Sequence, residues 1–281
     1  MKPIKKILLP TDFSDNSWNA IKYALELFKH EACNFFLLNT YMPKIYSVEY
    51  VSIDAAKFGV IDGLREVSET KLNEMNTRIV KEFHNPNHLF TQISSLNTLV
   101  DELRELQKTE DISYIIMGSK GATGAKEILF GSNTVHVFKH VRCPVLAVPS
   151  SFTFETPHDI LFPSDYEIAF HDKLVSPIME IARKHHSRVN FLHVSYGSEL
   201  SKKQEKNKQK LESYFEKTAY LFHEVSNQNV TGAIADFQSR YRVNLLVMIK
   251  SKHSFFENLF FKSITNQIGY HLNIPLLVIP A

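Results

Sequence analysis

Short apolar segments alternate along the chain with longer amphipathic ones. In the first half the apolar segments are 4–10, 34–40, 88–94, 112–118 and 144–148. The segments 16–30, about 60–84, 97–108 and 132–140 lie between them and have helical spacing. In the first of these, Ala20, Tyr23, Ala24 and Leu27 fall on one face. This alternation is typical of βαβ units with right-handed crossovers, so it predicts an α/β fold with a parallel sheet.

The same pattern occurs a second time. Apolar segments recur near 158–163, 188–194, 220–225, 244–249 and 275–279. Asp12 matches Asp165, 153 positions later, whereas Met117 matches Met248, only 131 positions later. The first copy therefore carries 22 additional residues, which the comparison places within 41–87. Residues 150–157 lack apolar periodicity and read as a linker, which predicts two domains, 1–150 and 151–281.

Bulk properties narrow the functional classes. The length of 281 residues suits two domains. A formal net charge of +2 argues against a nucleic-acid partner or an anionic membrane. The two cysteines, Cys33 and Cys143, give no disulfide framework and suit a reducing cytosol, so we expect a cytoplasmic protein. No apolar stretch approaches the ~20 residues of a membrane helix.

A glycine-rich loop is the main candidate for chemistry. Gly118 and Gly121 follow the apolar segment 112–117, and Gly131 with Ser132 precedes the helical segment 133–140. Glycines let backbone N–H groups approach an anion, and a helix N-terminus adds partial positive charge, so the loop predicts a phosphate cradle. The spacing matches neither the G-x4-G-K-[ST] loop nor the G-x-G-x-x-G fingerprint.

Three separated motifs carry a resemblance to a known family. Residues 118–134 resemble the nucleotide loop of ATP-binding universal stress proteins. Residues 7–14, which include Asp12, resemble that family's first strand and acidic residue, and 142–149 resemble its last strand. Because the pattern is repeated, the resemblance covers the whole chain. It implies two tandem, doubly wound, five-stranded parallel sheets of the adenine nucleotide alpha hydrolase-like type, with strand order 3-2-1-4-5. In that order Asp12 and Gly118 meet where the strand order reverses, and ligands bind at such points.

The resemblance also implies a ligand and its contacts. The first repeat is expected to bind ATP or a related adenine nucleotide (AMP or ADP), with Mg²⁺ accompanying a triphosphate. Thr40 would contact adenine through its backbone, Lys120 would supply a mobile cation, and Ser132 would both cap its helix and donate to phosphate. The expected nucleotide-binding residues are Pro10, Thr11, Asp12, Thr40, Met117, Gly118, Lys120, Gly121, Gly131, Ser132, Asn133 and Thr134. The alternatives are that Asp12 is only a turn carboxylate and that the glycines serve only tight turns.

No motif for an enzyme is found. The sequence has no Gly-x-Ser-x-Gly elbow, no His-Glu-x-x-His and no Cys-x-x-Cys. His193 replaces Asn39 in the second repeat and reads as an interior residue rather than a base. We therefore expect a stress-response regulator that is not an enzyme, or at most a weak ATPase. The alternatives are a slow ATPase and a purely structural interaction module that binds no nucleotide.

The second repeat has lost the glycines of the loop. Gly118, Gly121 and Gly131 align with Ile249, Lys252 and Lys262. Four phenylalanines follow, which either fill the vacated crevice or form a contact patch for a partner or for the other repeat; they are Phe255, Phe256, Phe260 and Phe261. We therefore expect one nucleotide site for each chain.

Two further expectations concern assembly and the inserted residues. The apolar segments 144–148 and 275–279 carry no charge that would block edge pairing, which favours an intramolecular pseudo-dimer of the repeats through their last strands. A homodimer through another surface is left open. Residues 41–59, with Tyr41, Tyr46 and Tyr50, either flank the nucleotide or form an ordinary surface excursion.

Overall fold

The structure is a computed structural model that describes residues 4–43, 53–120, 130–197, 199–226, 229–251 and 273–281. The described chain forms two compact units. The first contains the described residues up to Lys120 together with 131–143, and the second contains Phe130 and the described residues from Pro144 onwards. No helix in the described ranges is long and apolar enough to cross a membrane.

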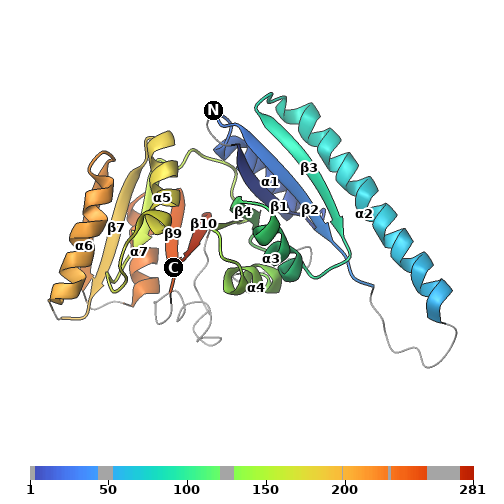
Figure 1. The fold of residues 1–281 in the computed structure, drawn as a ribbon. Helices are drawn as coiled ribbons and strands as arrows, with labels where there is room; N and C mark the ends of the chain where they lie inside the picture. Colours follow the sequence, from blue (N-terminus) through green and yellow to red (C-terminus); the bar gives the residue numbers. More distant parts are fainter. Residues whose placement is uncertain (1–3, 44–52, 121–129, 198, 227–228, 252–272) are drawn as a thin grey trace. The chain divides into compact units, whose positions relative to one another are not determined.

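The first unit is a parallel sheet with helices on both faces (Figure 1). Its strands lie in the order β3-β2-β1-β4, all parallel. Trp18 of α1 contacts Phe83 of α2, so these helices share a face, and right-handed crossovers put α3 and α4 on the other. In chain order the elements are β1 (Lys5–Pro10), α1 (Asp15–Leu27), β2 (Cys33–Thr40), α2 (Ile53–Phe83), β3 (His88–Ser95), α3 (Leu99–Thr109), β4 (Ile112–Gly118) and α4 (Ser132–His140).

The second unit repeats this order and adds one strand. Its sheet runs β5-β10-β9-β6-β7-β8, in which β8-β7-β6-β9-β10 is the predicted order 3-2-1-4-5. The additional strand, β5, is the last strand of the first repeat. The elements are β5 (Val145–Val148), β6 (Asp159–Pro163), α5 (Asp172–Lys184), β7 (Arg188–Ser195), α6 (Lys202–Phe215), β8 (Tyr220–Ser226), α7 (Val230–Arg240), β9 (Leu245–Lys250) and β10 (Leu276–Pro280).

The pairing predicted for the two last strands is present. β5 lies antiparallel to β10, with Leu277 opposite Leu146 and Val278 opposite Val145. Val145 and Leu277 are almost wholly buried, as expected for apolar strands whose edges are covered. The compact units accordingly divide before β5, and the boundary at residue 150 stays a prediction about the repeats.

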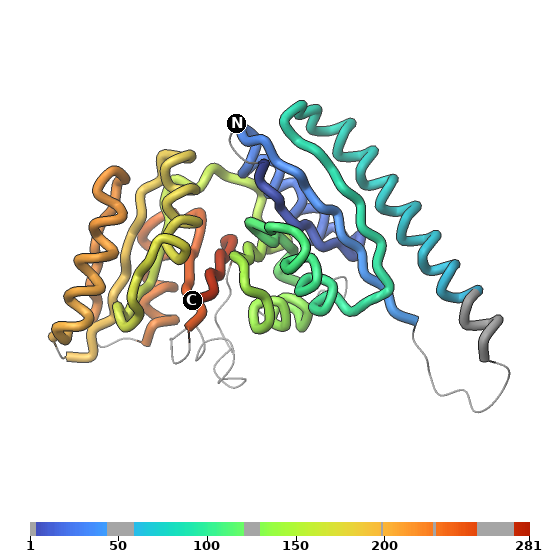
Figure 2. The backbone as a smooth tube through the Cα atoms, viewed as in Figure 1, coloured from blue at the N-terminus to red at the C-terminus, as the bar shows by residue number. Residues whose placement is uncertain are grey.

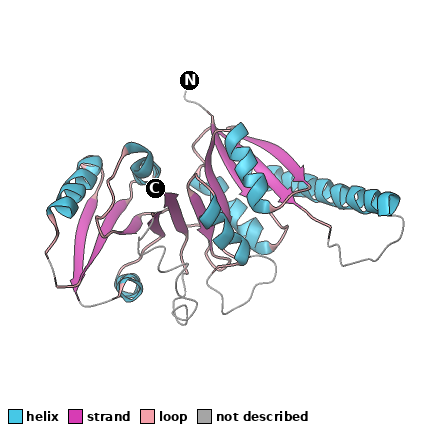
Figure 3. Cartoon of the chain, turned by 60° about the horizontal axis from the view of Figure 1, so that its bottom comes forward, coloured by secondary structure: helices cyan, strands magenta, loops and turns pink. Residues whose placement is uncertain are grey.

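The additional residues of the first repeat lengthen a helix. Helix α2 has 31 residues, whereas its counterpart α6 has 14. The sequence pattern predicts the helix only from about residue 60, but it begins at Ile53. Figures 2 and 3 show α2 running alongside β3 and continuing past the end of that strand.

The sheet interior explains why the strand predictions hold. The β1 residues Ile7, Leu8 and Leu9 are fully buried, and so are Phe35 and Leu37 on β2. A parallel sheet is covered on both faces, so its central strands read as continuous apolar runs rather than as alternating ones. This burial fixes the positions of the strand ends, where the candidate site lies.

Candidate functional site

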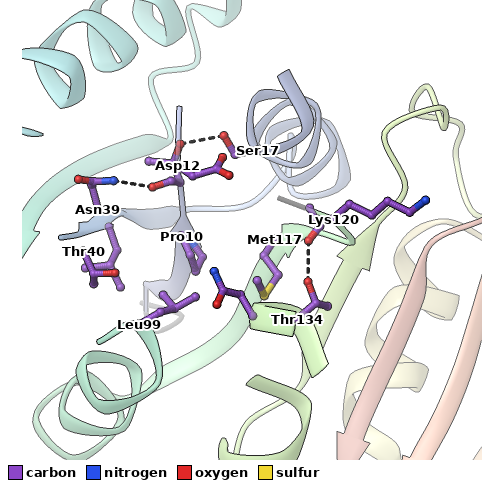
Figure 4. Close-up of a pocket in the computed structure, with 13 residues that line it drawn as sticks. Pro10, Asp12, Ser17, Asn39, Thr40, Leu99, Met117, Lys120 and Thr134 are labelled. Atoms are coloured by element: carbon purple, nitrogen blue, oxygen red, sulfur yellow. Dashed lines mark hydrogen bonds between the residues drawn. The ribbon is translucent and has the colours of Figure 1, made fainter. Parts of the chain in front are cut away.

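A pocket lies at the carboxyl ends of β1, β2 and β4 in the first unit (Figure 4). This is the point where the strand order reverses, because β1 lies between β2 and β4. The pocket measures about 120 Å³, less than the roughly 300–1,000 Å³ usual for ligand sites, so its described residues enclose only part of a nucleotide-sized ligand. The lining residues are Pro10, Thr11, Asp12, Ser17, Leu38, Asn39, Thr40, Leu99, Met117, Gly118, Lys120, Asn133 and Thr134.

The turn after β1 is held by Asp12. The Asp12 carboxylate accepts hydrogen bonds from the Ser14 backbone N–H (3.1 Å) and from the Ser14 hydroxyl (2.5 Å). Ser14 in turn caps α1 by accepting from the Ser17 N–H at 3.3 Å. Phe13 adopts a positive φ of 63°, which is uncommon for a residue with a side chain. Asp12 therefore shapes the turn and also lines the pocket.

The second repeat keeps this turn. Tyr166 takes the place of Phe13 with a φ of 56°, and Asp165 accepts from the Glu167 N–H at 3.1 Å. Its persistence in a repeat that has lost the glycine loop supports a structural role for both aspartates. Asp12 therefore has a role in the turn and also lines the pocket, so both predicted readings stay open.

Thr11 forms a rigid part of the pocket wall. Its N–H donates to the Leu38 carbonyl (2.8 Å), its hydroxyl bonds the Ser17 hydroxyl (2.9 Å), and its carbonyl accepts from the Asn39 amide (2.8 Å). The side chains of Thr11, Ser17 and Asn39 are all buried. These hydrogen bonds give the wall a defined geometry and connect it to Asn39.

Gly118 is required for a close approach within the protein. A Cβ at this position would lie 3.1 Å from the Asn16 carbonyl oxygen and 3.2 Å from the Lys120 carbonyl oxygen. Both are backbone atoms, which cannot swing aside as the end of a side chain could. Gly118 thus lets the end of β4 pass close to the first turn of α1, which brings the two halves of the pocket together. This packing role accompanies any contact with a phosphate.

The start of α4 corrects one prediction. The helix is capped by Gly131 without a side-chain hydrogen bond, and Ser132 is an exposed residue of the first turn. Ser132 therefore does not cap the helix. The end of β4 is instead tied to α4 by the buried Thr134, whose hydroxyl donates to the Gly118 and Ser119 carbonyls at 3.1 and 3.2 Å. The Gly131 N–H also donates to the Ser119 carbonyl, at 2.8 Å.

The structure gathers most of the predicted residues. Nine of them line the pocket: Pro10, Thr11, Asp12, Thr40, Met117, Gly118, Lys120, Asn133 and Thr134. Gly131 and Ser132 adjoin the pocket at the start of α4 but do not line it. Gly121 lies outside the described residues, and so do Tyr46 and Tyr50. The lining therefore comes from segments more than 100 positions apart in the sequence.

Four lining residues were missed by the sequence analysis: Ser17, Leu38, Asn39 and Leu99. Leu38 and Asn39 directly precede the predicted Thr40, so their place at the end of the second strand was a usable signal. Leu99 begins α3 after its cap, Thr98, and no motif marks it. Together with Pro10 and Met117, the two leucines give the pocket an apolar wall suited to a flat ring.

Charge at the site is mainly positive toward the loop. Lys120 lines the pocket from the end of β4, and the N-terminus of α4 adds a partial positive charge. Within the described part of the chain, no group of three or more His, Cys, Asp or Glu side chains is placed to hold a metal ion. Lys120 and the start of α4 therefore fit an anionic ligand.

The second repeat differs from the first at the position of Gly118. Ile249, in the place of Gly118, is 7% exposed and carries a branched side chain. His193, predicted to be an interior residue, is half-buried: Nδ1 lies 3.0 Å from the Ser164 carbonyl, and the ring stacks on Tyr166. Lys252, Lys262 and the four phenylalanines lie outside the described residues.

Comparison with known proteins assigns the family. The model of the universal stress protein family matches twice, over residues 3–149 and 158–280. Universal stress protein MJ0577 from Methanocaldococcus jannaschii is 30% identical over 155 residues, which cover 51% of this chain and 94% of that protein. The chain belongs to the universal stress protein family, as a tandem repeat.

A solved structure supports the fold. A universal stress protein from Archaeoglobus fulgidus matches with a TM-score of 0.69 and 20% identity over 98% of both chains. A universal stress protein in complex with cAMP matches with a TM-score of 0.36 and 21% identity, over 51% of this chain and 96% of that one. The first of these supports the tandem α/β architecture along the entire chain.

Proposed function

We propose that the first repeat binds ATP or a related adenine nucleotide and that occupancy regulates the protein in a stress response. The observation that carries the proposal is the pocket itself. A rigid backbone wall at Thr11, an apolar wall that includes Leu99 and Met117, and Lys120 beside the start of α4 converge at the reversal of strand order. The apolar wall suits the base, and Lys120 with the start of α4 suits the phosphates.

Isothermal titration calorimetry with ATP tests the proposal. We expect about one site per chain, because Ile249 replaces the glycine in the second repeat. Two equivalent sites would contradict the assignment. If neither ATP nor AMP, ADP or cAMP gives heat of binding, the structural interaction module is favoured instead.

Lys120→Ala gives a sharper test. Hydrogen bonds to charged groups contribute about 1.5–3 kcal/mol, so loss of the ammonium should weaken ATP binding roughly tenfold or more. The matched control is Lys108→Ala, which removes an exposed lysine of α3 that pairs with Glu105. Equal affinities for the two variants would show that Lys120 does not face the phosphates. Gly118→Val should also lose binding, but it must be shown to fold, because a side chain there meets the Asn16 backbone.

The expectation of a regulator rather than an enzyme is part of the proposal. Of the pocket residues, Asp12 is the carboxylate, and it is engaged by Ser14 in the turn. We expect phosphate release with ATP and Mg²⁺ to stay at the level of a buffer blank. Turnover well above that blank, abolished by Lys120→Ala, would favour the slow ATPase.

The pseudo-dimer belongs to the same proposal. The antiparallel pairing of β5 with β10 supports joining of the repeats through their last strands. Residues 41–59 remain proposed to flank the nucleotide; 44–52 lie outside the described residues, and the rest includes the first turns of α2.

A further inference from the structure

Helix α2 is anchored to its sheet by one row of buried side chains. Its buried residues are Ser68, Leu72, Met75 and Ile79, at helical spacing. Ser68 is the polar member of this row and stands at its N-terminal end. Residues 59–67, which precede it, are all exposed or half-buried. Ser68 is thus the first buried residue of α2 among those whose burial is described.

Ser68 is joined to the candidate site by a chain of hydrogen bonds. Its hydroxyl donates to the Asn39 side-chain oxygen at 2.8 Å, and the Asn39 amide donates to the Thr11 carbonyl at 2.8 Å. The Ser94 hydroxyl donates to Ser68, also at 2.8 Å. Figure 4 shows Asn39 bonded to the strand end beside Asp12 at the pocket. We call the connection Thr11–Asn39–Ser68 the relay.

A second contact joins the projecting part of α2 to the same strand end. Arg65, one turn before Ser68, interacts with the side chain of Tyr41, and this interaction raises the pKa of the guanidinium. Tyr41 directly follows Thr40, a pocket residue, and its own N–H donates to the Ser95 carbonyl at 3.0 Å. Both contacts therefore begin at pocket-lining positions of β2 or next to them.

The second repeat shows that the fold does not need the relay. There His193 contacts the Ser164 carbonyl, as Asn39 contacts the Thr11 carbonyl in the first repeat. The difference lies in how the following helix is held. Helix α6 is anchored instead to the backbone of the turn: Asn207 donates to the Tyr166 carbonyl at 2.8 Å and Gln204 to the Asp165 carbonyl at 3.0 Å. The relay and the long helix thus occur together, in the repeat that has the pocket.

We propose that the relay transmits nucleotide occupancy to α2. The regulated surface is the part of α2 that precedes Ser68, residues 53–67, which we call its projecting half. The inference rests on the proposed function. A ligand held against Thr11 and Thr40 would fix Asn39, and Asn39 would hold Ser68 and so the docking of α2. A ligand can shift this docking only by its differential affinity for the docked state, and docking must favour the ligand by the same factor.

Hydrogen exchange with and without saturating ATP tests the inference on the full chain. In the wild type we expect amides of 59–72 to exchange about fivefold more slowly with ATP, the lower end of typical allosteric coupling. Ser68→Ala should remove most of this slowing while still giving a binding isotherm. Thr77→Ala, on the exposed side of the same helix, should respond like the wild type.

Ser94→Ala distinguishes transfer of the ligand effect through Ser68 from structural support of α2 by the two serines. It removes the bond into Ser68 but leaves Ser68 bonded to Asn39, so ATP should still slow exchange in α2. If Ser94→Ala and Ser68→Ala behave alike, the serines only support the fold and the relay is wrong. Wild-type slowing in Ser68→Ala, or no slowing in a wild type that binds ATP by calorimetry, also overturns it.

The outcomes distinguish this inference from the proposed function. Absence of ATP binding in the wild type defeats both, whereas binding without a response in α2 defeats the relay alone. If Ser68→Ala does not fold, Arg65→Ala provides a second probe, because its side chain is exposed and interacts with Tyr41. Arg65→Ala should reduce the slowing in 59–67, and a wild-type response there would count against the coupling.

Discussion

At the scale of single residues, His88 is a buried group with incomplete hydrogen bonding. It is 7% exposed at the start of β3, with its ring edge-on to Phe35. Nε2 lies 3.1 Å from the Phe28 carbonyl oxygen and 3.1 Å from the Asn85 amide nitrogen, whereas Nδ1 has no partner among the described residues. A charged imidazole carries an N–H on both nitrogens, so protonation would leave the Nδ1 N–H unsatisfied.

This environment makes stability depend on pH. The pKa of His88 lies below its ordinary value, and the main cause is burial. The unfolded chain then binds a proton more readily than the folded one, so the contribution of His88 is present above about pH 6.5 and is lost as the pH falls below it. Urea unfolding from pH 7.5 to 5 should show decreasing stability, with a shallower decrease in His88→Asn. The decrease should not vanish, because burial also lowers the pKa of His223. Identical slopes for the wild type and His88→Asn would contradict this.

At the scale of elements, the projecting half of α2 is held mainly by its own helical bonds. It contains Gly59 and Gly63, which are exposed and have open space where a Cβ would be. Glycine inside a helix costs about 0.8–1.0 kcal/mol relative to alanine. The segment we propose as the regulated surface is thus weakened by its own sequence.

Gly63→Ala should strengthen this segment by up to about 1 kcal/mol. The expected readout is slower hydrogen exchange in 59–67 without ligand. Gly232→Ala in α7 is the matched control, because its Cβ would lie 3.2 Å from the Asn229 side-chain oxygen that caps the helix. We expect no gain there. Faster exchange in Gly63→Ala would show that the segment is not an ordinary exposed helix.

At the scale of the whole molecule, the last strand of each repeat joins the other in one sheet. β5 contributes Val145, which is 1% exposed and lies opposite Val278 of β10. A lysine at Val145 would bring a charge into this dry contact. The second unit should therefore depend on a strand that the first repeat supplies.

Val145→Lys should destabilise the protein by about 3 kcal/mol or more, the range for burying an unpaired charge. Urea unfolding gives the free energy, and hydrogen exchange should rise in β10. Val80→Lys is the control, because Val80 is 53% exposed on α2 and surface changes usually stay within about 0.5 kcal/mol. Similar effects of the two lysines would contradict a buried β5–β10 contact.

The elements and the repeat could be predicted from the amino-acid pattern, and nine pocket residues from the motifs that resemble the family. Apolar periodicity reports local burial, and for that reason the ends of the strands were predicted to within one or two residues. The motifs at Asp12 and Gly118 could be matched because the turn and the close approach each demand particular residue types. The extent of α2 was underestimated, because the pattern predicts a start at about residue 60 and the helix begins at Ile53.

The contacts that join these elements appear only in the folded chain. Ser68 and Leu99 carry no local signal, since their roles depend on atoms that folding brings from distant segments. Ser132 lost its predicted capping role to Gly131, because a cap is set by backbone conformation at the helix start and not by residue type alone. The pairing of β5 with β10 likewise depends on which strand edge is free, because an edge exists only once its sheet has formed.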